Sequence, residues 1–305
     1  DPKMPHRHGT EQFTGWTADI MTDLILKFLR DEPRGKPWFV TAAFIIPHLP
    51  FQCADAWSRP FRDQGLSPQL ADCYGSIAHM DACIGRLLDG LRETGQADDT
   101  IVVFTSDNGM SSKGEPMQEF SEQDWATRNV HRLRGHKAWV FENGIRVPLL
   151  VRWPGAIQPG ERKQFGCAED ILPTVLDLAG IEPEAVRRQP FTGVSLRPAL
   201  RNAAIVFDRP DAFRLAIAGA GSPRGAPGDA IERKYEDHHL VLRGPRFKYH
   251  SLPGGQSLLY DIEADPWEMT DVSDQYAHVA AALAAECRER WDNVIATGRT
   301  FPFQE

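Results

Sequence analysis

The sequence predicts an α/β protein, with a mixed sheet between helices and a small α+β subdomain at its C-terminal end. Helical periodicity and short apolar runs alternate to about residue 200, which is typical of an α/β layered domain. Beyond a stretch rich in glycine and proline, short strand patterns precede a last helix pattern. We therefore expect a larger domain over residues 1–202. A C-terminal subdomain with a small antiparallel sheet and a terminal helix is expected over residues 203–305.

The first elements follow from periodicity. Apolar side chains at helical spacing predict helices over residues 16–30 and 75–92. The apolar stretch over residues 38–46 predicts a buried strand, which ends in a proline turn. Residues 100–104 form a continuous apolar run, typical of a strand covered on both faces. This strand stops at the turn sequence 106–109.

The next residues, about 28 of them, lack clear periodicity and predict a long functional or disordered connection. A further strand is expected over 147–151, and a helix over 169–179 with Gly180 just past its end.

In the C-terminal subdomain, residues 219–228 predict a loop. Two strands, 239–242 and 247–249, flank a Gly-Pro turn like a hairpin. A third strand over 258–260 and a final helix over 275–296 complete the expected elements. No internal repeat is visible.

Composition limits the class of protein. The chain has 305 residues, of which 42% are hydrophobic and 25% charged, as is ordinary for a globular protein. It contains no run of eighteen apolar residues, so we expect no membrane partner. The net charge of −8 argues against a nucleic-acid partner. An anionic substrate is still compatible, because a local basic pocket can oppose the overall charge.

Polar residues follow the predicted strands. Asp107 and Asn108 come directly after the strand at 100–104, where ligands bind in open α/β sheets. Their oxygens are hard ligands suited to Ca²⁺ or Mg²⁺, although Asp-Asn-Gly is also an ordinary turn sequence. His48 follows the strand at 38–46 and can donate a proton to a leaving oxygen, or it is a solvated turn histidine. Lys137 ends the long connection and can oppose an oxyanion, or it is a surface lysine.

The order of several motifs along the chain is more specific than any single one. Together they cover nearly the whole sequence and resemble the type I sulfatase family of the alkaline-phosphatase-like superfamily. The matching segments are Pro47–Phe51, Tyr74–Asp81, Ile84–Leu88, Thr100–Gly109, Lys137, Glu142–Gly155, Asp170–Thr174, Gly193–Leu196 and Leu259–Pro266.

The resemblance implies an activity and a role for each site residue. It implies a sulfuric ester hydrolase in which Asp107 and Asn108 hold a metal ion, usually Ca²⁺, with Mg²⁺ as the other choice. Lys137 matches the lysine that contacts the sulfate oxygens. His48 matches the histidine that contacts the ester and protonates the leaving oxygen. Glu142 and Arg146 match neighbouring positions, which we interpret as an ion pair supporting a turn.

The sequence departs from the family where the nucleophile is expected. Members carry an upstream Cys/Ser-x-Pro/Ala-x-Arg signature whose first residue becomes formylglycine, and an Asp-Asp pair that supplies further metal ligands. None of the five cysteines fits this signature, and no Asp-Asp pair precedes His48. We therefore expect this chain to be the C-terminal two-thirds of an enzyme and to be inactive alone. A missing N-terminal segment of the same protein would carry the formylglycine.

The substrate is less clearly indicated. Trp125, Arg128, His131, Arg132 and Arg134 in the long connection suit a sulfated carbohydrate, although a solvated charged loop is the alternative. One rival function is a phosphonate or phosphodiester hydrolase of the same superfamily, whose members often have histidine where Asn108 stands. The other is a non-enzymatic binding protein derived from a sulfatase. The resemblance alone implies a secreted or periplasmic protein.

Overall fold

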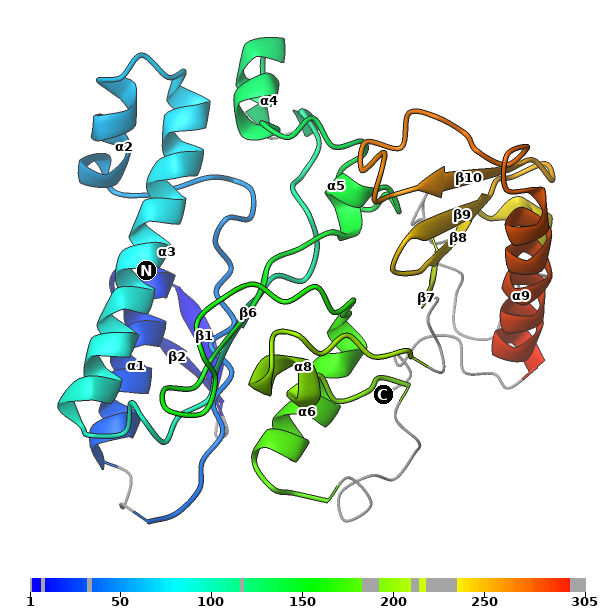
Figure 1. The fold of residues 1–305 in the computed structure, drawn as a ribbon. Helices are drawn as coiled ribbons and strands as arrows, with labels where there is room; N and C mark the ends of the chain where they lie inside the picture. Colours follow the sequence, from blue (N-terminus) through cyan, green and yellow to red (C-terminus); the bar gives the residue numbers. More distant parts are fainter. Residues whose placement is uncertain are drawn as a thin grey trace. The chain divides into compact units, whose positions relative to one another are not determined.

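A computed structural model describes residues 2–6, 9–31, 35–115, 118–182, 192–209, 214–217 and 235–296 (Figure 1). The chain forms two compact units. Unit 1 comprises Asp1–Val102, Lys113–Val130 and Arg152–Gly155, and unit 2 comprises Val103–Ser112, His131–Val151 and Ala156–Glu305. The domain boundary expected after residue 202 stays a prediction, and the loop expected over 219–228 lies outside the described residues. Among the described helices, none combines the length and apolar character needed to cross a membrane.

Three helices dominate unit 1: α1 (Thr17–Asp31), α2 (Asp55–Arg62) and α3 (Pro68–Glu93). The helices predicted over 16–30 and 75–92 are confirmed as α1 and α3, but α3 begins earlier. Ser67 caps it, because its hydroxyl accepts a hydrogen bond of 3.2 Å from the backbone of Leu70.

The Leu26 side chain of α1 packs directly on Gly90 of α3. A Cβ placed on Gly90 would lie 2.2 Å from Leu26 Cδ2, so a larger residue there would require the Leu26 side chain to move. A short antiparallel hairpin of β1 (Lys3–His6) and β2 (Gly9–Gln12) precedes α1.

The buried strand predicted over residues 38–46 is wrong. Residues 37–45 have no regular secondary structure, and Phe39 and Ile45 are 78% and 71% exposed. An apolar run becomes a strand only when a neighbouring strand satisfies its backbone polar groups. Among the described residues, no strand pairs with this segment. Two of its large apolar side chains, Phe39 and Ile45, therefore remain exposed, whereas its other large apolar side chains are half-buried.

The connection between Asn108 and Lys137 contains more order than its lack of periodicity predicts. It forms α4 (Glu122–Arg128) and the short paired strands β4 (Gly114–Glu115) and β5 (Gln118–Glu119). Ser121 and Asp124 form a capping box at the start of α4. A helix of two turns is too short to show a helical period, whereas its capping residues can be read from the sequence.

Two strands flank the candidate site residues of unit 2. β3 (Val102–Thr105) pairs with β6 (Leu149–Arg152), and the short helix α5 (Glu142–Ile145) precedes β6. Both strands are confirmed. The prediction that the strand at 100–104 is covered on both faces is wrong for the described residues, because Phe104 is 39% exposed.

The helix predicted over 169–179 is also confirmed. It forms as η1 (Ala168–Asp170) followed by α6 (Ile171–Leu178), and Gly180 follows with a φ of +70°. The next described helix, α8 (Arg197–Arg201), lies just beyond the Gly193–Leu196 motif.

Asp170 ties these segments together. Its carboxylate accepts hydrogen bonds of 2.9 Å from Val194 N, 2.8 Å from Cys167 N and 2.7 Å from Arg209 Nη2. Burial by itself would raise the pKa of Asp170, but these donors outweigh it, so the pKa lies below its usual value. Gly193 passes so close to this turn that an added Cβ would lie 2.0 Å from Glu169 O. The Asp170–Thr174 and Gly193–Leu196 motifs therefore act as one structural unit.

Replacing Thr174 with valine tests this unit. The Thr174 hydroxyl accepts a buried hydrogen bond of 2.9 Å from Leu196 N, which an isosteric valine cannot accept. We expect the free energy of unfolding to fall by about 1–3 kcal/mol, the cost of an unsatisfied buried donor. Urea unfolding followed by circular dichroism measures it. Thr10→Val, at an exposed position of β2, is the matched control and should change stability by less than about 0.5 kcal/mol. Equal effects of both substitutions would contradict the assignment.

The C-terminal part of unit 2 is a four-stranded antiparallel sheet. Its strands are ordered β10 (Ser257–Asp261), β9 (Phe247–Ser251), β8 (Leu240–Arg243) and β7 (Arg214–Ile217), and a short turn of helix, η2 (Tyr235–Asp237), precedes β8. The predicted hairpin is confirmed, with Leu242 opposite Tyr249. The third strand is confirmed as β10, and β7 was not predicted.

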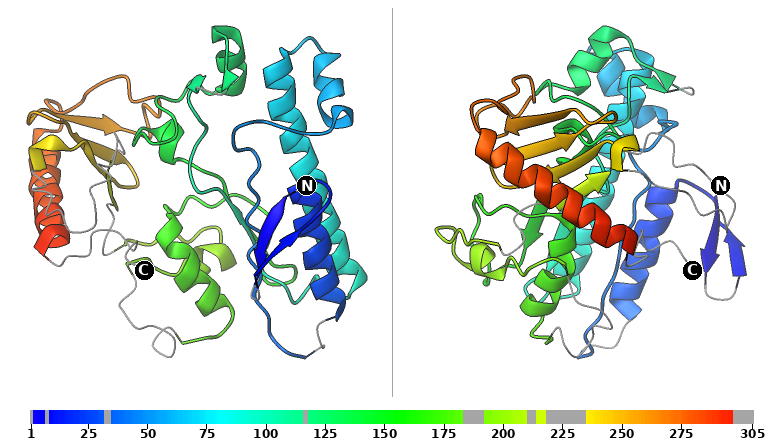
Figure 2. Two further views of the ribbon diagram at one scale, coloured as in Figure 1. Left: turned by 180° about the vertical axis from the view of Figure 1, so that it is seen from behind. Right: turned by 90° about the vertical axis from the view of Figure 1, so that its right-hand side faces the viewer.

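Helix α9 (Ala277–Ala296) covers one face of this sheet, as Figure 2 shows, and confirms the final helix. The sheet and α9 share a core that excludes water from one face of the strands. The fully enclosed members of this core are Tyr235, Leu240, Leu242, Tyr249, Leu259, Leu283, Cys287 and Trp291.

Candidate functional site

Asp107 and Asn108 lie on the turn that follows β3. Asp107 is exposed and Asn108 is half-buried. The Asp107 carboxylate accepts a hydrogen bond of 2.9 Å from Asn108 N, and Ser106 Oγ donates to Asn108 O at 3.0 Å. These short-range bonds fix the turn, so the two adjacent side chains are presented together at the end of the strand.

The donor set of this turn fits a hard divalent cation. Asn108 Nδ2 donates to Gly109 O at 2.9 Å, so the side-chain oxygen is the end left to accept or to ligate. A carboxylate and an amide oxygen are ligands that Ca²⁺ and Mg²⁺ prefer. Two oxygens fill only part of a Ca²⁺ coordination shell of six to eight, so further ligands must complete such a site.

The Lys137 backbone is bonded to the same turn region. Lys137 N donates to Met110 O at 2.7 Å, and Gly109 N donates to Gly144 O at 2.9 Å. The chain after Asp107 therefore runs between the Lys137 segment and α5. Three of the four candidate residues, Asp107, Asn108 and Lys137, belong to unit 2 and lie on segments joined by backbone hydrogen bonds.

Glycine is required where these segments meet. A Cβ on Gly109 would lie 1.8 Å from Asn143 O, and one on Gly144 would lie 2.1 Å from Trp139 O. Atoms cannot approach so closely, and both neighbours are backbone atoms that cannot rotate away. The two glycines therefore allow the turn and α5 to pack backbone against backbone.

His48 belongs to unit 1. It is exposed on a turn in which His48 N donates to Ile45 O at 2.9 Å and its Nδ1 bonds Leu49 O at 2.7 Å. The local geometry holds the ring with Nε2 directed away from that carbonyl. The expected contact of His48 with the ester stays a prediction.

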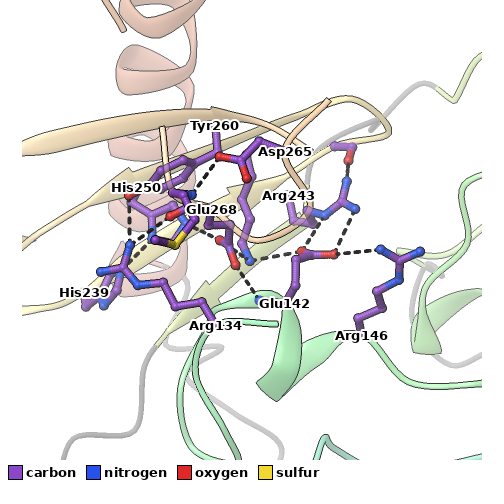
Figure 3. Close-up of polar contacts among 12 residues, drawn as sticks. Arg134, Glu142, Arg146, His239, Arg243, His250, Tyr260, Asp265 and Glu268 are labelled. Atoms are coloured by element: carbon purple, nitrogen blue, oxygen red, sulfur yellow. Dashed lines mark hydrogen bonds and ion pairs between the residues drawn. The ribbon is translucent and has the colours of Figure 1, made fainter. Parts of the chain in front are cut away.

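Behind α5 lies a buried charge network (Figure 3). Glu142 Oε1 accepts hydrogen bonds from Arg243 Nε at 3.0 Å and Lys248 Nζ at 3.1 Å, and Lys248 pairs with Glu268 at 2.8 Å. His250 Nε2 bonds Glu268 at 3.0 Å. The side chains of Glu142, Lys248, Glu268 and His250 are at most 1% exposed. Two buried carboxylates are thus matched by a lysine and an arginine.

The expected pair of Glu142 with Arg146 is the weakest contact of this network. Their closest atoms are 4.0 Å apart and Arg146 is 58% exposed. The main partners of Glu142 come instead from β8 and β9, about a hundred positions later in the chain. Sequence reasoning missed Lys248 and Glu268. The only nearby signal in the sequence was the Leu259–Pro266 motif. It marked this region as part of the family resemblance but did not indicate which residues it contacts.

Electrostatics favour one protonation state of Glu142 and one of His239. Burial would raise the pKa of Glu142, but the charges of Lys248 and Arg243 outweigh it, so its pKa lies below the usual value. Burial, together with the charges of His250 and Lys248, lowers the pKa of His239 to about 4. His239 is therefore neutral at pH 7 and packs edge-on against Phe141, with ring centroids 5.6 Å apart.

A small open pocket of about 140 Å³ lies on the Lys137 segment. Its lining residues are Arg134, Gly135, His136, Trp139 and Phe141. Trp139 is 46% exposed and stacks on Phe141, with ring centroids 6.0 Å apart. Such an aromatic wall with a flanking imidazole can hold the apolar face of a ring-shaped ligand.

Two of the three arginines of the long connection take part in the fold. Arg128 is stacked over Phe120 at 4.3 Å, and burial lowers its pKa. Arg134 donates to Tyr260 Oη at 3.2 Å and to Glu268 O at 3.0 Å. These contacts reduce the support that the side chains of Arg128 and Arg134 give to a carbohydrate substrate.

A second group with metal-ligand chemistry lies in unit 1. Asp19, His79 and Cys83 have ligand atoms within 4.8 Å of one another. His79 Nε2 is already bonded to Asp19 at 2.9 Å, and Arg86 pairs with the same carboxylate at 3.2 Å. A guanidinium in that place supplies the positive charge that a cation would bring. We interpret this group as a polar contact between α1 and α3.

The sequence matches the family model described as Sulfatase over residues 3–181. An arylsulfatase of Clostridium perfringens (strain 13 / Type A) is 25% identical over 303 residues, with 86% of this chain and 54% of the relative covered. A steryl-sulfatase of Rattus norvegicus is 39% identical over 264 residues, with 79% and 42% covered. The chain therefore spans about half the length of these two relatives.

A solved structure, described as Ps i-CgsB in complex with k-i-k-neocarrahexaose, superposes with a TM-score of 0.75. The sequences are 23% identical, and the match covers 95% of this chain and 58% of that one. At this level of identity the similarity concerns the fold.

Proposed function

This chain belongs to the sulfatase family and has the alkaline-phosphatase-like α/β fold, and on that premise we propose that it forms part of a metal-dependent sulfuric ester hydrolase. The observation that carries the proposal is the meeting of three segments in unit 2. The Asp107–Asn108 turn, the Lys137 backbone and α5 are joined by the bonds from Lys137 N to Met110 O and from Gly109 N to Gly144 O. This arrangement places a hard-ligand pair beside the segment that carries a lysine.

Each residue has a distinct role in the proposal. Asp107 and Asn108 hold a divalent cation, Ca²⁺ or Mg²⁺, whose charge stabilises the sulfate group. The Lys137 ammonium attracts the sulfate oxygens and the departing oxygen, on which negative charge grows as the S–O bond breaks. His48 donates a proton to that oxygen, so that an alcohol leaves.

The nucleophile is not assigned to residues 1–305. The family uses a formylglycine made from a Cys or Ser signature, and none of the five cysteines here begins that signature. Ser58 to Arg62 matches the serine form, but Ser58 is buried inside α2 and its hydroxyl accepts a hydrogen bond from Arg62, so we do not assign it as the nucleophile. The roles of Asp107, Asn108, Lys137 and His48 do not depend on which part of the protein supplies it.

We propose a sulfated carbohydrate as the substrate class. The pocket beside Lys137 exposes Trp139 next to His136, and an aromatic ring can stack on the apolar face of a sugar. The protein of the solved structure above is described in complex with a neocarrahexaose. The relatives named for aryl and steryl sulfates mark the alternatives, so the substrate test must include them.

Two substitutions separate metal binding from ester binding. In the full-length protein, Asn108→Ala should weaken Ca²⁺ binding about 10-fold or more, because the cation loses a direct oxygen ligand. Lys137→Ala should lower kcat about 100-fold while Ca²⁺ affinity is unchanged, because its partner is the ester. Isothermal titration with CaCl₂ and steady-state hydrolysis of aryl and sugar sulfates measure the two effects.

Lys163→Ala is the matched control, since Lys163 is an exposed lysine of the same unit. Lys163→Ala should leave both the Ca²⁺ affinity and kcat unchanged. Loss of Ca²⁺ binding in Lys137→Ala, or unaltered Ca²⁺ binding in Asn108→Ala, would contradict the assigned roles. Faster turnover of phosphate esters than of sulfate esters would favour the phosphohydrolase alternative.

A further inference from the structure

We propose that Glu268 and Lys248 are positioning residues of the candidate site. They act through Glu142, which fixes the segments that carry Lys137 and the Asp107–Asn108 turn. What the site catalyses rests on the proposed function, whereas the positioning rests on contacts within unit 2.

The first link joins the C-terminal sheet region to the start of α5. Glu268 Oε2 accepts a hydrogen bond of 2.6 Å from the backbone N–H of Glu142, one of the orphan donors at a helix start. Lys248 Nζ reaches both carboxylates, at 3.1 Å from Glu142 and 2.8 Å from Glu268. The main chain and the side chain of Glu142 are therefore both held from the sheet side.

The second link joins α5 to the site. Asn143 N donates to Arg134 O at 3.0 Å, and Asn143 Nδ2 donates to Gly135 O at 2.9 Å. These bonds fix the segment just before Lys137. Gly144 O accepts from Gly109 N, which fixes the segment just after Asn108. Neither the Glu268 carboxylate nor the Lys248 ammonium takes part in these bonds, so both side chains act through Glu142. The backbone carbonyl of Glu268 also accepts a hydrogen bond of 3.0 Å from Arg134, which a substitution of the Glu268 side chain leaves in place.

The energetics of buried charges support a positioning role. Well-packed apolar side chains often stabilise a fold as much as a buried ion pair does, or more. Buried charged groups differ from apolar side chains, because each hydrogen bond they make requires a partner in a defined direction. The Lys248 ammonium and the Glu268 carboxylate are both fully buried, and His250 occupies another acceptor site of Glu268 at 3.0 Å. Each of the two buried carboxylates thus has three charged or hydrogen-bonding contacts, which favours one placement of the Glu142 backbone.

Hydrogen exchange of the full-length protein, followed by mass spectrometry, tests the proposal without an activity assay. Glu268→Gln keeps the size of the side chain but removes the charge that pairs with Lys248. We expect exchange in peptides spanning 107–112 and 134–146 to accelerate about 10-fold or more, while α9 changes less than about 2-fold.

Leu283→Ala is the matched control. Leu283 lies in the core between α9 and the sheet and is 3% exposed. Its truncation should accelerate exchange in α9 and leave 107–112 unchanged. Acceleration spread evenly over unit 2 in Glu268→Gln, as for general destabilisation, would overturn the proposal. So would unchanged exchange at 107–112.

A second variant keeps the test open if Glu268→Gln does not fold. Arg243→Lys retains the charge but loses the pair of bonds from Arg243 to Glu142, at 3.0 and 3.3 Å. It should accelerate exchange in the same two peptides, and unchanged exchange there would overturn the proposal. Because exchange is measured without substrate, a protein that hydrolyses no sulfate ester would refute the proposed function and leave this result standing.

Discussion

Glu142→Ala is expected to lower the free energy of unfolding by about 3–5 kcal/mol, the cost of removing one partner from a buried ion pair. The substitution leaves the buried Lys248 ammonium with one carboxylate in place of two, and Arg243 loses both bonds to Glu142. Urea unfolding of the full-length protein, followed by circular dichroism, measures the change. The matched control is Arg146→Ala, which removes the exposed, 4.0 Å contact to the same carboxylate. It should cost less than about 0.5 kcal/mol.

The effect of Glu142→Ala should depend on pH in one direction. The pKa of Glu142 is lowered in the folded state, so its stabilisation is fully present above its unfolded pKa of about 4.3. That stabilisation is lost as the pH falls through the folded value. The difference in stability between wild type and Glu142→Ala should therefore be largest near pH 7 and shrink towards pH 3. A difference that grows on acidification would mean that Glu142 is not ionised in the folded protein.

The second large effect concerns residues 1–305 tested alone. We expect no measurable turnover of an activated aryl sulfate, even with Ca²⁺ present. Asp107 and Asn108 supply one carboxylate and one amide oxygen, which leaves most of the Ca²⁺ shell to water. Without a covalent nucleophile, a water molecule would have to attack without the positioning that makes such steps fast.

The control for this experiment is the Lys137→Ala variant of the same chain. Turnover by residues 1–305 that disappears in Lys137→Ala would contradict the prediction, because it would place a nucleophile within these residues. Turnover that survives Lys137→Ala would come from a contaminating enzyme. Light scattering should accompany the assay, since side chains such as Phe39 and Ile45 are exposed and favour aggregation.

Local patterns predicted local structure well. α1 and α3 follow from apolar side chains at helical spacing, and the hairpin of β8 and β9 follows from two apolar runs around a Gly-Pro turn. The segment over 38–46 has an equally strong apolar run, yet it forms no strand. A strand depends on a partner elsewhere in the chain, whereas a helix satisfies its own backbone.

In the candidate site, too, local features could be predicted from the sequence and long-range contacts could not. The turn at Asp107 and the position of Lys137 follow from the order of motifs along the chain. The partners of Glu142 do not, because Arg243 and Lys248 lie 101 and 106 positions away. A helical spacing of four residues suggested Arg146, which lies at the surface. No sequence pattern distinguishes a lysine that will be buried, such as Lys248, from an exposed one.

The way Lys137 is held has a consequence for how such enzymes diversify. Its main chain is fastened to Met110 by a backbone hydrogen bond, which any residue but proline could make. Neighbours such as Trp139 can therefore be exchanged without displacing the main chain of Lys137. Gly109 and Gly144 have no such latitude, because any side chain there would strike the backbone. New substrate preferences should thus arise by substitution around these two glycines, and a mutant library aimed at altered specificity should randomise Trp139 while leaving Gly109 and Gly144 unchanged.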